Sequence, residues 1–290
     1  MSQSVIVGLS GGLGNQMFQY AAGRALSLRL QVQLRLDLSW YANQKERKYA
    51  LDDFAIHVEF AAYPLSIPSV VQSLESRVSR RWARRRMGSR VFREPHFHFC
   101  PAFLELEEPV YLEGYWQSER YFDAVREVIA ADFALTGELP PKCLPIREQI
   151  LAKEAICFHV RRGDYVSNPA TASVHELCPL EYYQQGASIV AAGHPNVHGF
   201  VFTDDPVWAR EHFKVPFPTT VVDVNGPDEA QWDLHLMASC KHFVIANSSL
   251  SWWAAWLGSA TDKQVIAPGK WFKTEGKSTI DLIPAGWTRI

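Results

Sequence analysis

The sequence lacks the segments that direct a protein into or across a membrane. Residues 1–4 include no basic residue, and the apolar stretch at 5–7 is much shorter than the core of a signal peptide. No run approaches the roughly 18 consecutive apolar residues that a membrane-spanning helix needs. We therefore expect a cytoplasmic protein.

The sequence also lacks an excess of one charge, paired cysteines and a histidine metal motif. It has 29 Lys and Arg against 31 Asp and Glu, a net charge of −2, and this balance does not indicate a nucleic-acid partner. Its five cysteines are odd in number and never form C-x-x-C, which favours free thiols over a disulfide framework or a cysteine zinc site. Because none of the ten histidines belongs to an H-E-x-x-H motif, we expect no bound metal.

What is present is an ordinary globular composition of two-domain length. At roughly 150 residues per domain, a chain of 290 residues predicts about two domains. Segment 136–145 contains three prolines and a glycine, and it is the best linker in the chain. We therefore place the domains at 1–145 and 146–290.

Both halves alternate strands with helices. In the first half, an apolar strand at 4–9 runs into three glycines, then a helix at 17–30 and a strand at 31–36. The second half predicts strands at 155–160, 199–202, 220–224, 242–245 and 264–267, separated by helices at 179–192, 206–213, 228–239 and 249–258. This alternation is typical of parallel sheets covered on both faces. We predict an α/β fold in which two such domains face each other across a cleft.

Parallel sheets bind ligands beyond the carboxyl ends of their strands, and polar residues gather there in the second half. Arg161 follows the strand at 155–160 on the same face as His159, whereas Arg162 points to the other face. A guanidinium stays charged and donates to two oxygens in parallel, so Arg161 is suited to a diphosphate and Arg162 to a structural contact. An ion pair with Asp164 is the structural alternative for either arginine.

Two further strand ends carry candidate anion ligands. Asn247, Ser248 and Ser249 lead into the helix at 249–258, whose free amides and hydroxyls would hold a phosphate. N-capping by Ser248 or Ser249 is the alternative, and the two roles are compatible. Asp205 precedes a proline at the start of a helix, so a capping role and a ligand role are both open.

The glycine segment of the first half leaves other classes of function open. Gly12-x-Gly14 lacks the third glycine of a dinucleotide fingerprint, yet Asp37 ends the second strand about where an acid that binds a ribose would lie. An NAD-dependent enzyme is therefore a rival prediction. A non-catalytic module that binds a sugar or a nucleotide is another.

Four segments together resemble a known family. They are 11–20 (GGLGNQMFQY), 114–122 (GYWQSERYF), 159–165 (HVRRGDY) and 245–253 (IANSSLSWW). In this order and spacing they resemble the α-1,2-fucosyltransferases of glycosyltransferase family 11, particularly the bacterial ones, over nearly the whole chain. The resemblance implies the GT-B fold, with GDP-fucose held mainly by the second domain and the acceptor by the first.

The resemblance also implies the reaction. L-fucose would be transferred with inversion to the 2-hydroxyl of an acceptor galactose in a surface glycan such as an O-antigen, without metal or other cofactor. Another fucosyl linkage is the alternative. The resemblance places Arg161 on the donor diphosphate and Asn15 beside the donor fucose.

The remaining site residues are predicted from the same segments and strand ends. The further donor contacts are Asp205, Asn247, Ser248 and Ser249. The acceptor contacts are Gln16, Asp37, Tyr115 and Trp116. The catalytic set is Arg161, His159 and Asp164, and the alternative proton acceptors are His159, Asp164 and Asp37.

Eight arginines and no acidic residue lie between Arg77 and Arg93. The plain interpretation is a solvated helix face. The functional one is contact with an anionic surface, either lipid headgroups or a phosphorylated acceptor. Peripheral contact with a membrane would suit an enzyme whose acceptor glycan is linked to a lipid.

Overall fold

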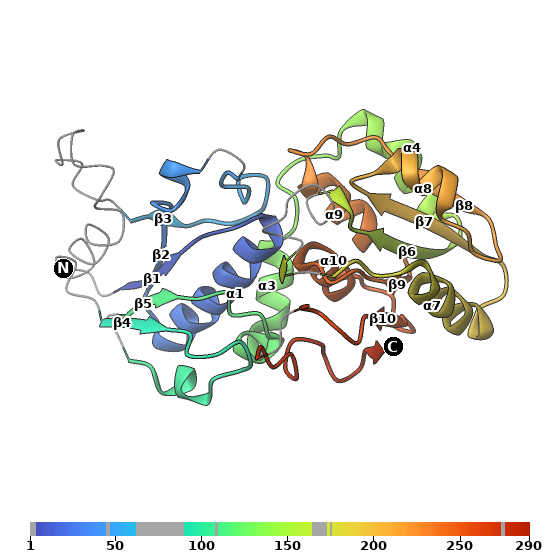
Figure 1. The fold of residues 1–290 in the computed structure, drawn as a ribbon. Helices are drawn as coiled ribbons and strands as arrows, with labels where there is room; N and C mark the ends of the chain where they lie inside the picture. Colours follow the sequence, from blue (N-terminus) through green and yellow to red (C-terminus); the bar gives the residue numbers. More distant parts are fainter. Residues whose placement is uncertain are drawn as a thin grey trace. The chain divides into compact units, whose positions relative to one another are not determined.

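The computed structural model describes residues 4–44, 47–61, 90–107, 110–163, 173–174, 176–273 and 276–290 (Figure 1). The chain divides into two compact units, Met1–Leu135 and Thr136–Ile290. The boundary lies at the start of the proline-containing segment 136–145, whereas the division predicted from the sequence lies at its end, inside helix α4 (Leu144–Leu151). Most of the arginine-rich segment Arg77–Arg93 lies outside the described residues.

The described part of the first unit is built on a five-stranded parallel sheet of order β3-β2-β1-β5-β4. Its strands are β1 (Ser4–Gly8), β2 (Gln33–Asp37), β3 (Glu59–Phe60), β4 (Arg90–Arg93) and β5 (Val110–Glu113). Its helices are α1 (Leu13–Leu30) and α3 (Arg126–Asp132), with 3-10 turns at Tyr41–Asn43, Pro101–Glu105, Glu119–Tyr121 and Asp123–Val125. Because β1 pairs with both β2 and β5, the segments that follow β1 and β5 leave the sheet side by side.

Helix α1 begins at Leu13, earlier than the sequence predicted, because Gly12 is its N-cap residue. The backbone N–H groups of Asn15 and Gln16 both donate to the Gly12 carbonyl, at 3.0 and 3.1 Å. Gly11 has a φ of +78°, a left-handed conformation that glycine adopts without a steric penalty. Asn15 and Gln16 therefore lie in the first turn of a helix, not in a loop.

The second unit is built on a six-stranded parallel sheet of order β11-β10-β9-β6-β7-β8. Its strands are β6 (Glu154–Val160), β7 (Val197–Thr203), β8 (Thr219–Val222), β9 (His242–Val244), β10 (Val265–Ala267) and β11 (Thr288–Arg289). Its described helices are α4, α7 (Leu180–Gly193), α8 (Pro206–His212), α9 (Ala230–Ala238) and α10 (Ser249–Leu257), with a 3-10 turn at Pro141–Cys143. The sequence predicted the first five strands and missed β11, which is too short to produce a periodic pattern.

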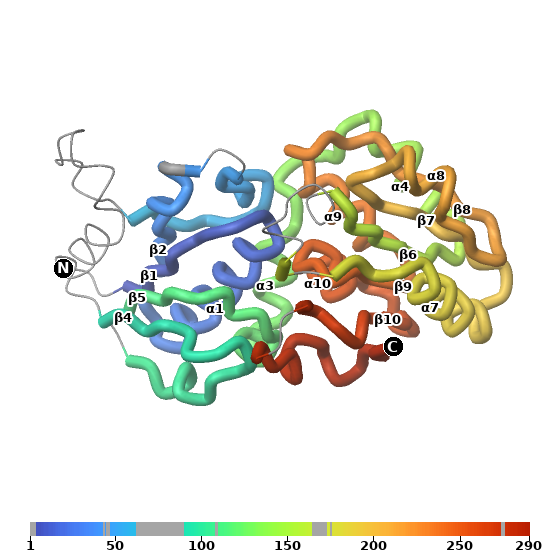
Figure 2. The backbone as a smooth tube through the Cα atoms, viewed as in Figure 1, coloured from blue at the N-terminus to red at the C-terminus, as the bar shows by residue number. Residues whose placement is uncertain are grey.

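The order of this sheet contains a point where the chain reverses its direction of travel. The trace in Figure 2 runs outward from β6 to β7 and β8, and then returns to place β9 on the other side of β6. Strand β6 pairs in parallel with β7 and with β9, in the register Val160↔Thr203 and Phe158↔Val244. In open parallel sheets, the crevice beyond the carboxyl ends of the two strands at such a point is where ligands bind.

Strand β6 is also the centre of the core of this unit. Each of its residues from Ala155 to Val160 is buried, which requires helices on both faces of the sheet. The ring of Phe158 packs against Phe213 at 5.1 Å between centroids, and Tyr183 from α7 packs on the same Phe213 at 5.7 Å. This packing holds the carboxyl end of β6 in one position.

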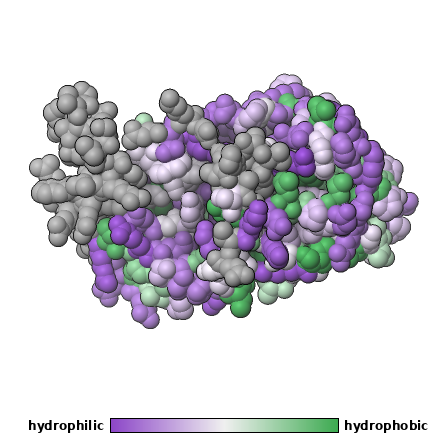
Figure 3. Space-filling view, viewed as in Figure 1, coloured by the Kyte–Doolittle hydropathy of each residue, from purple (hydrophilic) through white to green (hydrophobic). Residues whose placement is uncertain are grey.

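Figure 3 shows mainly hydrophilic residues on the face that it draws, with hydrophobic residues in small separate groups among the described residues. Among the exposed large hydrophobic side chains, Val207 and Ile280 are 64% and 73% exposed. Scattered exposure of this kind is normal for a globular protein. Within the described ranges, no helix combines the length and the apolar character required to cross a membrane.

Gly23 allows α1 to lie directly on β1. A Cβ atom at this position would overlap Val7 Cγ2 and would be 3.1 Å from Leu34 Cδ1, and both of these side chains are buried. Neither neighbour has free space into which it can move, because protein cores are close-packed.

We predict that Gly23→Ala lowers the free energy of unfolding by about 1–3 kcal/mol through overpacking, despite the better helix propensity of alanine. Chemical denaturation measures the change. Gly137→Ala is the matched control, because a Cβ at Gly137 would meet nothing within 4 Å. Equal stability of the two variants would contradict the close packing of α1 on β1.

Candidate functional site

Arg161 lies directly beyond the carboxyl end of β6, at the reversal point of the sheet. Its Nη1 is 2.7 Å from Oδ2 of Asp204, which follows the neighbouring strand β7, and both side chains are about one-quarter exposed. The predicted alternative partner, Asp164, lies outside the described residues. The ion pair therefore joins the ends of two adjacent strands and holds a guanidinium at the edge where ligands of such sheets bind.

Arg162 has a structural environment, as the alternation of side chains along the strand predicted. Its guanidinium lies over the ring of Trp208 in α8, 3.8 Å from the centroid, and its Nε is 3.4 Å from Oδ2 of Asp205. Oδ1 of the same carboxylate accepts from the backbone N–H of Trp208 at 3.1 Å, which makes Asp205 the N-cap of α8. Both oxygens of Asp205 thus have partners within the unit, and this favours the capping role over the donor-ligand role.

His159 is buried near the end of β6 and is 6% exposed. Its Nδ1 has no hydrogen-bond partner among the described residues, although its backbone carbonyl accepts from the Tyr183 hydroxyl at 3.0 Å. Burial, and to a smaller extent the charge of Arg161, lower the pKa of His159 to about 4, while Asp204 opposes this shift. The imidazole is therefore neutral at neutral pH.

The N-terminus of helix α10 follows β9, next to β6 in the sheet. Ser248 is the N-cap residue, but its side chain makes no capping hydrogen bond within the described structure. Its backbone carbonyl accepts from the N–H of Trp252 at 3.0 Å, as expected for the first turn. The first N–H groups of a helix have no partner within that helix, and the dipole makes this end positive. Ser248 and Ser249 therefore lie at a helix end suited to an anion.

Asn247 holds loops together. It is 2% exposed, and its Nδ2 donates to the carbonyls of Glu176 and Trp271, both at 3.0 Å. These two bonds use both N–H groups of the amide. These contacts favour a positioning role for the segments around Glu176 and Trp271 over the predicted donor contact.

The first turn of α1 uses its two amide side chains differently. Gln16 is fully buried, and its amide bonds the carbonyls of Gly11 and Lys48 and the N–H of Ala50, at 3.2, 2.9 and 2.9 Å. It therefore pins the segment 48–50 to the helix, which favours a structural role over the predicted acceptor contact. Asn15 is partly exposed, and its Oδ1 accepts from Gln117 Nε2 at 2.8 Å, so its Nδ2 is the end that can donate to a ligand.

Asp37, at the end of β2, is also engaged within the first unit. It is 2% exposed; its Oδ1 accepts from the backbone N–H of Ser39 at 2.8 Å and its Oδ2 from the Tyr111 hydroxyl at 2.5 Å. A carboxylate held in this way joins β2 to β5. These contacts favour a structural role over the predicted roles in acceptor binding and proton transfer.

Tyr115 and Trp116 follow β5 and differ in exposure. Tyr115 is 44% exposed, whereas Trp116 is fully buried. The Trp116 ring packs against Phe92, Phe103 and Tyr121, with centroid distances between 5.3 and 5.9 Å. Of the two predicted acceptor contacts, only Tyr115 presents its ring to solvent.

The structure therefore brings together a subset of the predicted residues in each unit. In the second unit, Arg161, His159, Ser248 and Ser249 lie at the ends of β6 and β9. In the first unit, Asn15 and Tyr115 follow β1 and β5. Asp204, which comes directly after β7, contacts Arg161 and was not among the predicted site residues.

The sequence profile described as "Glycosyl transferase family 11" matches residues 92–290, more than half of the chain. The chain belongs to this glycosyltransferase family. An α-1,2-colitosyltransferase of Escherichia coli is 32% identical to it, over 99% of this chain and 98% of that protein. The O-antigen biosynthesis glycosyltransferase WbnK of Escherichia coli is 30% identical, over 94% of this chain and 97% of that protein.

Solved structures support the fold of this glycosyltransferase. NodZ, an α-1,6-fucosyltransferase from Bradyrhizobium, superposes with a TM-score of 0.52 at 17% identity, covering 89% of this chain and 93% of that one. At this identity the likeness concerns the fold alone. The two Rossmann-like α/β units are those of the GT-B fold, as the sequence predicted.

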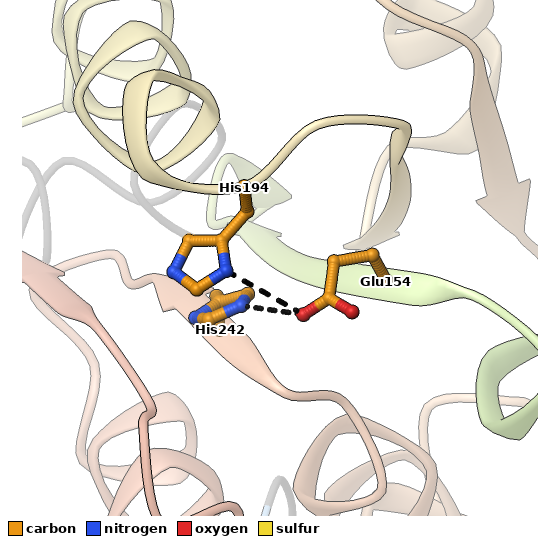
Figure 4. Close-up of side chains that lie close together, drawn as sticks. All are labelled: Glu154, His194 and His242. Carbon is orange, nitrogen blue, oxygen red and sulfur yellow. Dashed lines mark hydrogen bonds and ion pairs between the residues drawn. The ribbon is translucent and has the colours of Figure 1, made fainter.

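A second polar cluster lies at the opposite ends of the strands in this glycosyltransferase (Figure 4). Glu154 begins β6 and His242 begins β9, and they are joined by a 2.9 Å contact between Oε1 and Nε2, with His194 Nδ1 3.8 Å from the same oxygen. Within the described ranges, this is the group of side chains whose spacing would suit a metal ion.

The hydrogen bonds of the cluster argue against a metal. His242 Nδ1 accepts from the backbone N–H of Gln264 at 3.1 Å, so its Nε2 carries the proton and donates to Glu154. Metal binding at Nε2 would need the tautomer in which Nδ1 carries the proton. The Nδ1–H group of His242 would then face the backbone N–H of Gln264, and the hydrogen bond between them would be lost. Lys241 Nζ also neutralises Glu154, 2.7 Å from its Oε2. The cluster is a network that ties β6 to β9.

Buried ionisable groups make this glycosyltransferase less stable in acid. Burial lowers the pKa of both His159 and His235 to about 4, against about 6.5 for an unfolded histidine, and also lowers the pKa of His242. Between these values the unfolded chain binds protons that the folded chain does not, so stability falls as the pH decreases. Burial raises the pKa of Asp233 to about 6, and this has the opposite sign below pH 6.

We predict that stability is nearly constant between about pH 7 and pH 8 and falls between pH 6.5 and 5. His159 and His235 each contribute about 1.4 kcal/mol per pH unit, and Asp233 offsets one of them below about pH 6. Urea denaturation at a series of pH values measures the slope, and His235→Gln should make it shallower. Stability that rises on acidification through this range would contradict the burial of these histidines.

Proposed function

We propose that the protein is an inverting α-1,2-fucosyltransferase that transfers L-fucose from GDP-fucose to the 2-hydroxyl of a galactose in a surface glycan. The observation that carries the proposal is the position of Arg161 at the reversal point of the second sheet, next to the N-terminus of α10. The resemblance of the four sequence segments to α-1,2-fucosyltransferases supports the donor, the linkage and the galactose.

The donor diphosphate is proposed to lie at the ends of β6 and β9. These strands pair at Phe158↔Val244, so the segments that follow, with Arg161 on one and Ser248 on the other, leave the sheet side by side. A guanidinium donates to two phosphate oxygens in parallel, and the amides of a helix N-terminus donate to a third. Together they neutralise an anion with groups of the protein.

The same groups are proposed to assist departure of GDP. In a single displacement, the acceptor O2 forms a bond to the anomeric carbon of fucose as the bond from that carbon to the diphosphate oxygen breaks, and the hydroxyl proton leaves O2. Negative charge grows on the diphosphate in the transition state. Arg161 and the α10 amides are positioned before the reaction and stabilise that charge.

Inversion requires a group that accepts the proton from O2. Of the three predicted acceptors, Asp37 has both oxygens bonded and Asp164 lies outside the described residues. His159 is neutral at neutral pH, but its lowered pKa makes it a weak base. Asp37 is therefore the least suited of the three, and His159 and Asp164 stay as candidate bases.

The acceptor sugar is proposed to bind to the first unit, beside Tyr115 and the first turn of α1. The partly exposed Tyr115 ring offers an apolar face with a polar tip, the combination suited to a sugar. Asn15 lies in the segment after β1, which neighbours the segment after β5, and the resemblance suggests that it faces the transferred fucose. Gln117 Nε2 donates to Asn15 Oδ1 at 2.8 Å and so fixes the orientation of the Asn15 amide.

A colitosyl group is the second candidate for the transferred sugar. It is supported by the 32% identity to an α-1,2-colitosyltransferase over nearly the whole chain. Identity to WbnK supports a place in O-antigen synthesis for either sugar. We also propose a cytoplasmic location with peripheral contact through the arginines at 77–93, of which Arg90 and Arg93 are exposed on the edge strand β4.

A transfer assay tests the proposed function. The protein is incubated with EDTA, GDP-fucose and free or oligosaccharide galactosides, and the product linkage is determined by NMR. The proposal expects fucose on O2 with a configuration opposite to that of the donor. Fucose on another hydroxyl would contradict the proposed 1,2 linkage. Faster transfer from a nucleotide-linked colitose would contradict GDP-fucose as the donor.

The two neighbouring arginines should respond differently to replacement. Arg161→Ala is expected to reduce kcat/KM by at least about 100-fold with little loss of thermal stability, because it removes a charge-assisted contact to the diphosphate. Arg162→Ala should lower the melting temperature, because Trp208 and Asp205 lose their partner. Transfer that survives in Arg161→Ala, with a loss of stability instead, would contradict the donor role of Arg161.

A further inference from the structure

Asp204 is held more firmly than a carboxylate in a simple surface ion pair. Its Oδ1 accepts from the backbone N–H of Arg162 at 2.8 Å, while its Oδ2 lies 2.7 Å from Arg161 Nη1. The carboxylate therefore spans from a fixed backbone group to the guanidinium. Because its own strand, β7, pairs with β6 up to the register Val160↔Thr203, both ends of the contact belong to one rigid sheet.

Gly163 leaves the space that this carboxylate occupies. A Cβ atom at Gly163 would be 2.7 Å from Oδ2 and 3.0 Å from Cγ of Asp204, distances that an ordinary side chain does not tolerate. Three consecutive residues therefore adjoin Asp204. The side chain of Arg161 and the backbone N–H of Arg162 contact its carboxylate, and Gly163 has no side chain that would clash with it. The need for a glycine at position 163 therefore comes from the space that the Asp204 carboxylate occupies, and not from a left-handed backbone conformation.

We propose that Asp204 is the positioning residue for Arg161, and that it stays bound to Arg161 while the guanidinium grips the donor diphosphate. This inference rests on the proposed function and deepens it. The competing idea is that Asp204 occupies the phosphate site of Arg161 and is displaced by the donor. The bond to the Arg162 backbone disfavours displacement, and a guanidinium has donors for both a carboxylate and a phosphate.

The two ideas predict opposite effects of Asp204→Asn. An asparagine keeps the shape and can still accept from the Arg162 N–H, but it removes the charge that orients Arg161. A positioning role predicts that the Kd for GDP and the KM for GDP-fucose rise by about 10- to 100-fold, as for loss of a hydrogen bond to a charged group, with the acceptor KM unchanged. A competing role predicts that GDP binds more tightly.

Gly163→Ala provides an independent test, because it leaves every charge in place and displaces the Asp204 carboxylate by steric contact. It should weaken GDP binding like Asp204→Asn, and the double variant should be no worse than either single variant, since both act through one contact. Asp223→Asn is the matched control. It breaks an ion pair to Arg210 of the same length, 2.7 Å, on the surface of the same unit, and should leave GDP binding unchanged.

Titration calorimetry with GDP, on proteins whose circular dichroism matches that of the wild type, gives the decisive comparison. Weaker binding in both single variants, without additivity, supports the inference. Unchanged or tighter binding in Asp204→Asn overturns it while leaving the proposed function intact. A wild-type protein that does not bind GDP overturns the proposed function and this inference with it.

Discussion

The parallel pairing of β6 with β7 on one side and β9 on the other is the constraint on which the rest of the second unit depends. It buries β6 from Ala155 to Val160 and brings three strand ends to one edge. Arg161, Asp204 and the N-terminus of α10 owe their neighbourhood to this pairing and not to sequence proximity. The cluster of Glu154, His194 and His242 closes the other ends of the same strands.

At that edge two adjacent arginines, Arg161 and Arg162, have different partners. Arg162 is bound by a carboxylate and an aromatic ring that belong to α8, so it fixes the helix to the strand. Arg161 contacts the carboxylate of Asp204, which is itself tied to the backbone N–H of Arg162. Both arginines follow Val160, the last residue of β6, and they contact the carboxylates of two consecutive residues, Asp204 and Asp205 respectively.

Much of this organisation could be predicted from the sequence. The strands of the second sheet from β6 to β10 were predicted because strand-like and helix-like segments alternate along this half of the chain. The short strands β3 and β11, of two residues each, were not, because they contain too few residues to show periodicity. The start of α1 was placed too late because glycine is an unusual first-turn neighbour, and only the hydrogen bonds to Gly12 reveal the helix there.

The site residues show where sequence reasoning stops. Residue type and strand-end position selected Arg161, Ser248 and Ser249, which the structure leaves partly exposed. The same reasoning also selected Gln16, Asn247 and Trp116, which are buried and hold the backbone or the core. A sequence shows that a side chain can bind a ligand, but not whether a neighbouring carbonyl or ring already occupies it. Asp204 was not selected because its partner, Arg161, follows a different strand, and the sequence does not show which strand ends are neighbours.

The central claim is that the carboxyl edge of the second sheet binds a guanosine diphosphate. Thermal unfolding with EDTA present, in the absence and presence of GDP, GDP-fucose, GDP-mannose and NAD, tests it most directly, because a ligand that binds the native state raises the melting temperature. The account predicts a rise with GDP and GDP-fucose and none with NAD. A rise with NAD and none with GDP would contradict it, and would move the chemistry to the glycines before α1.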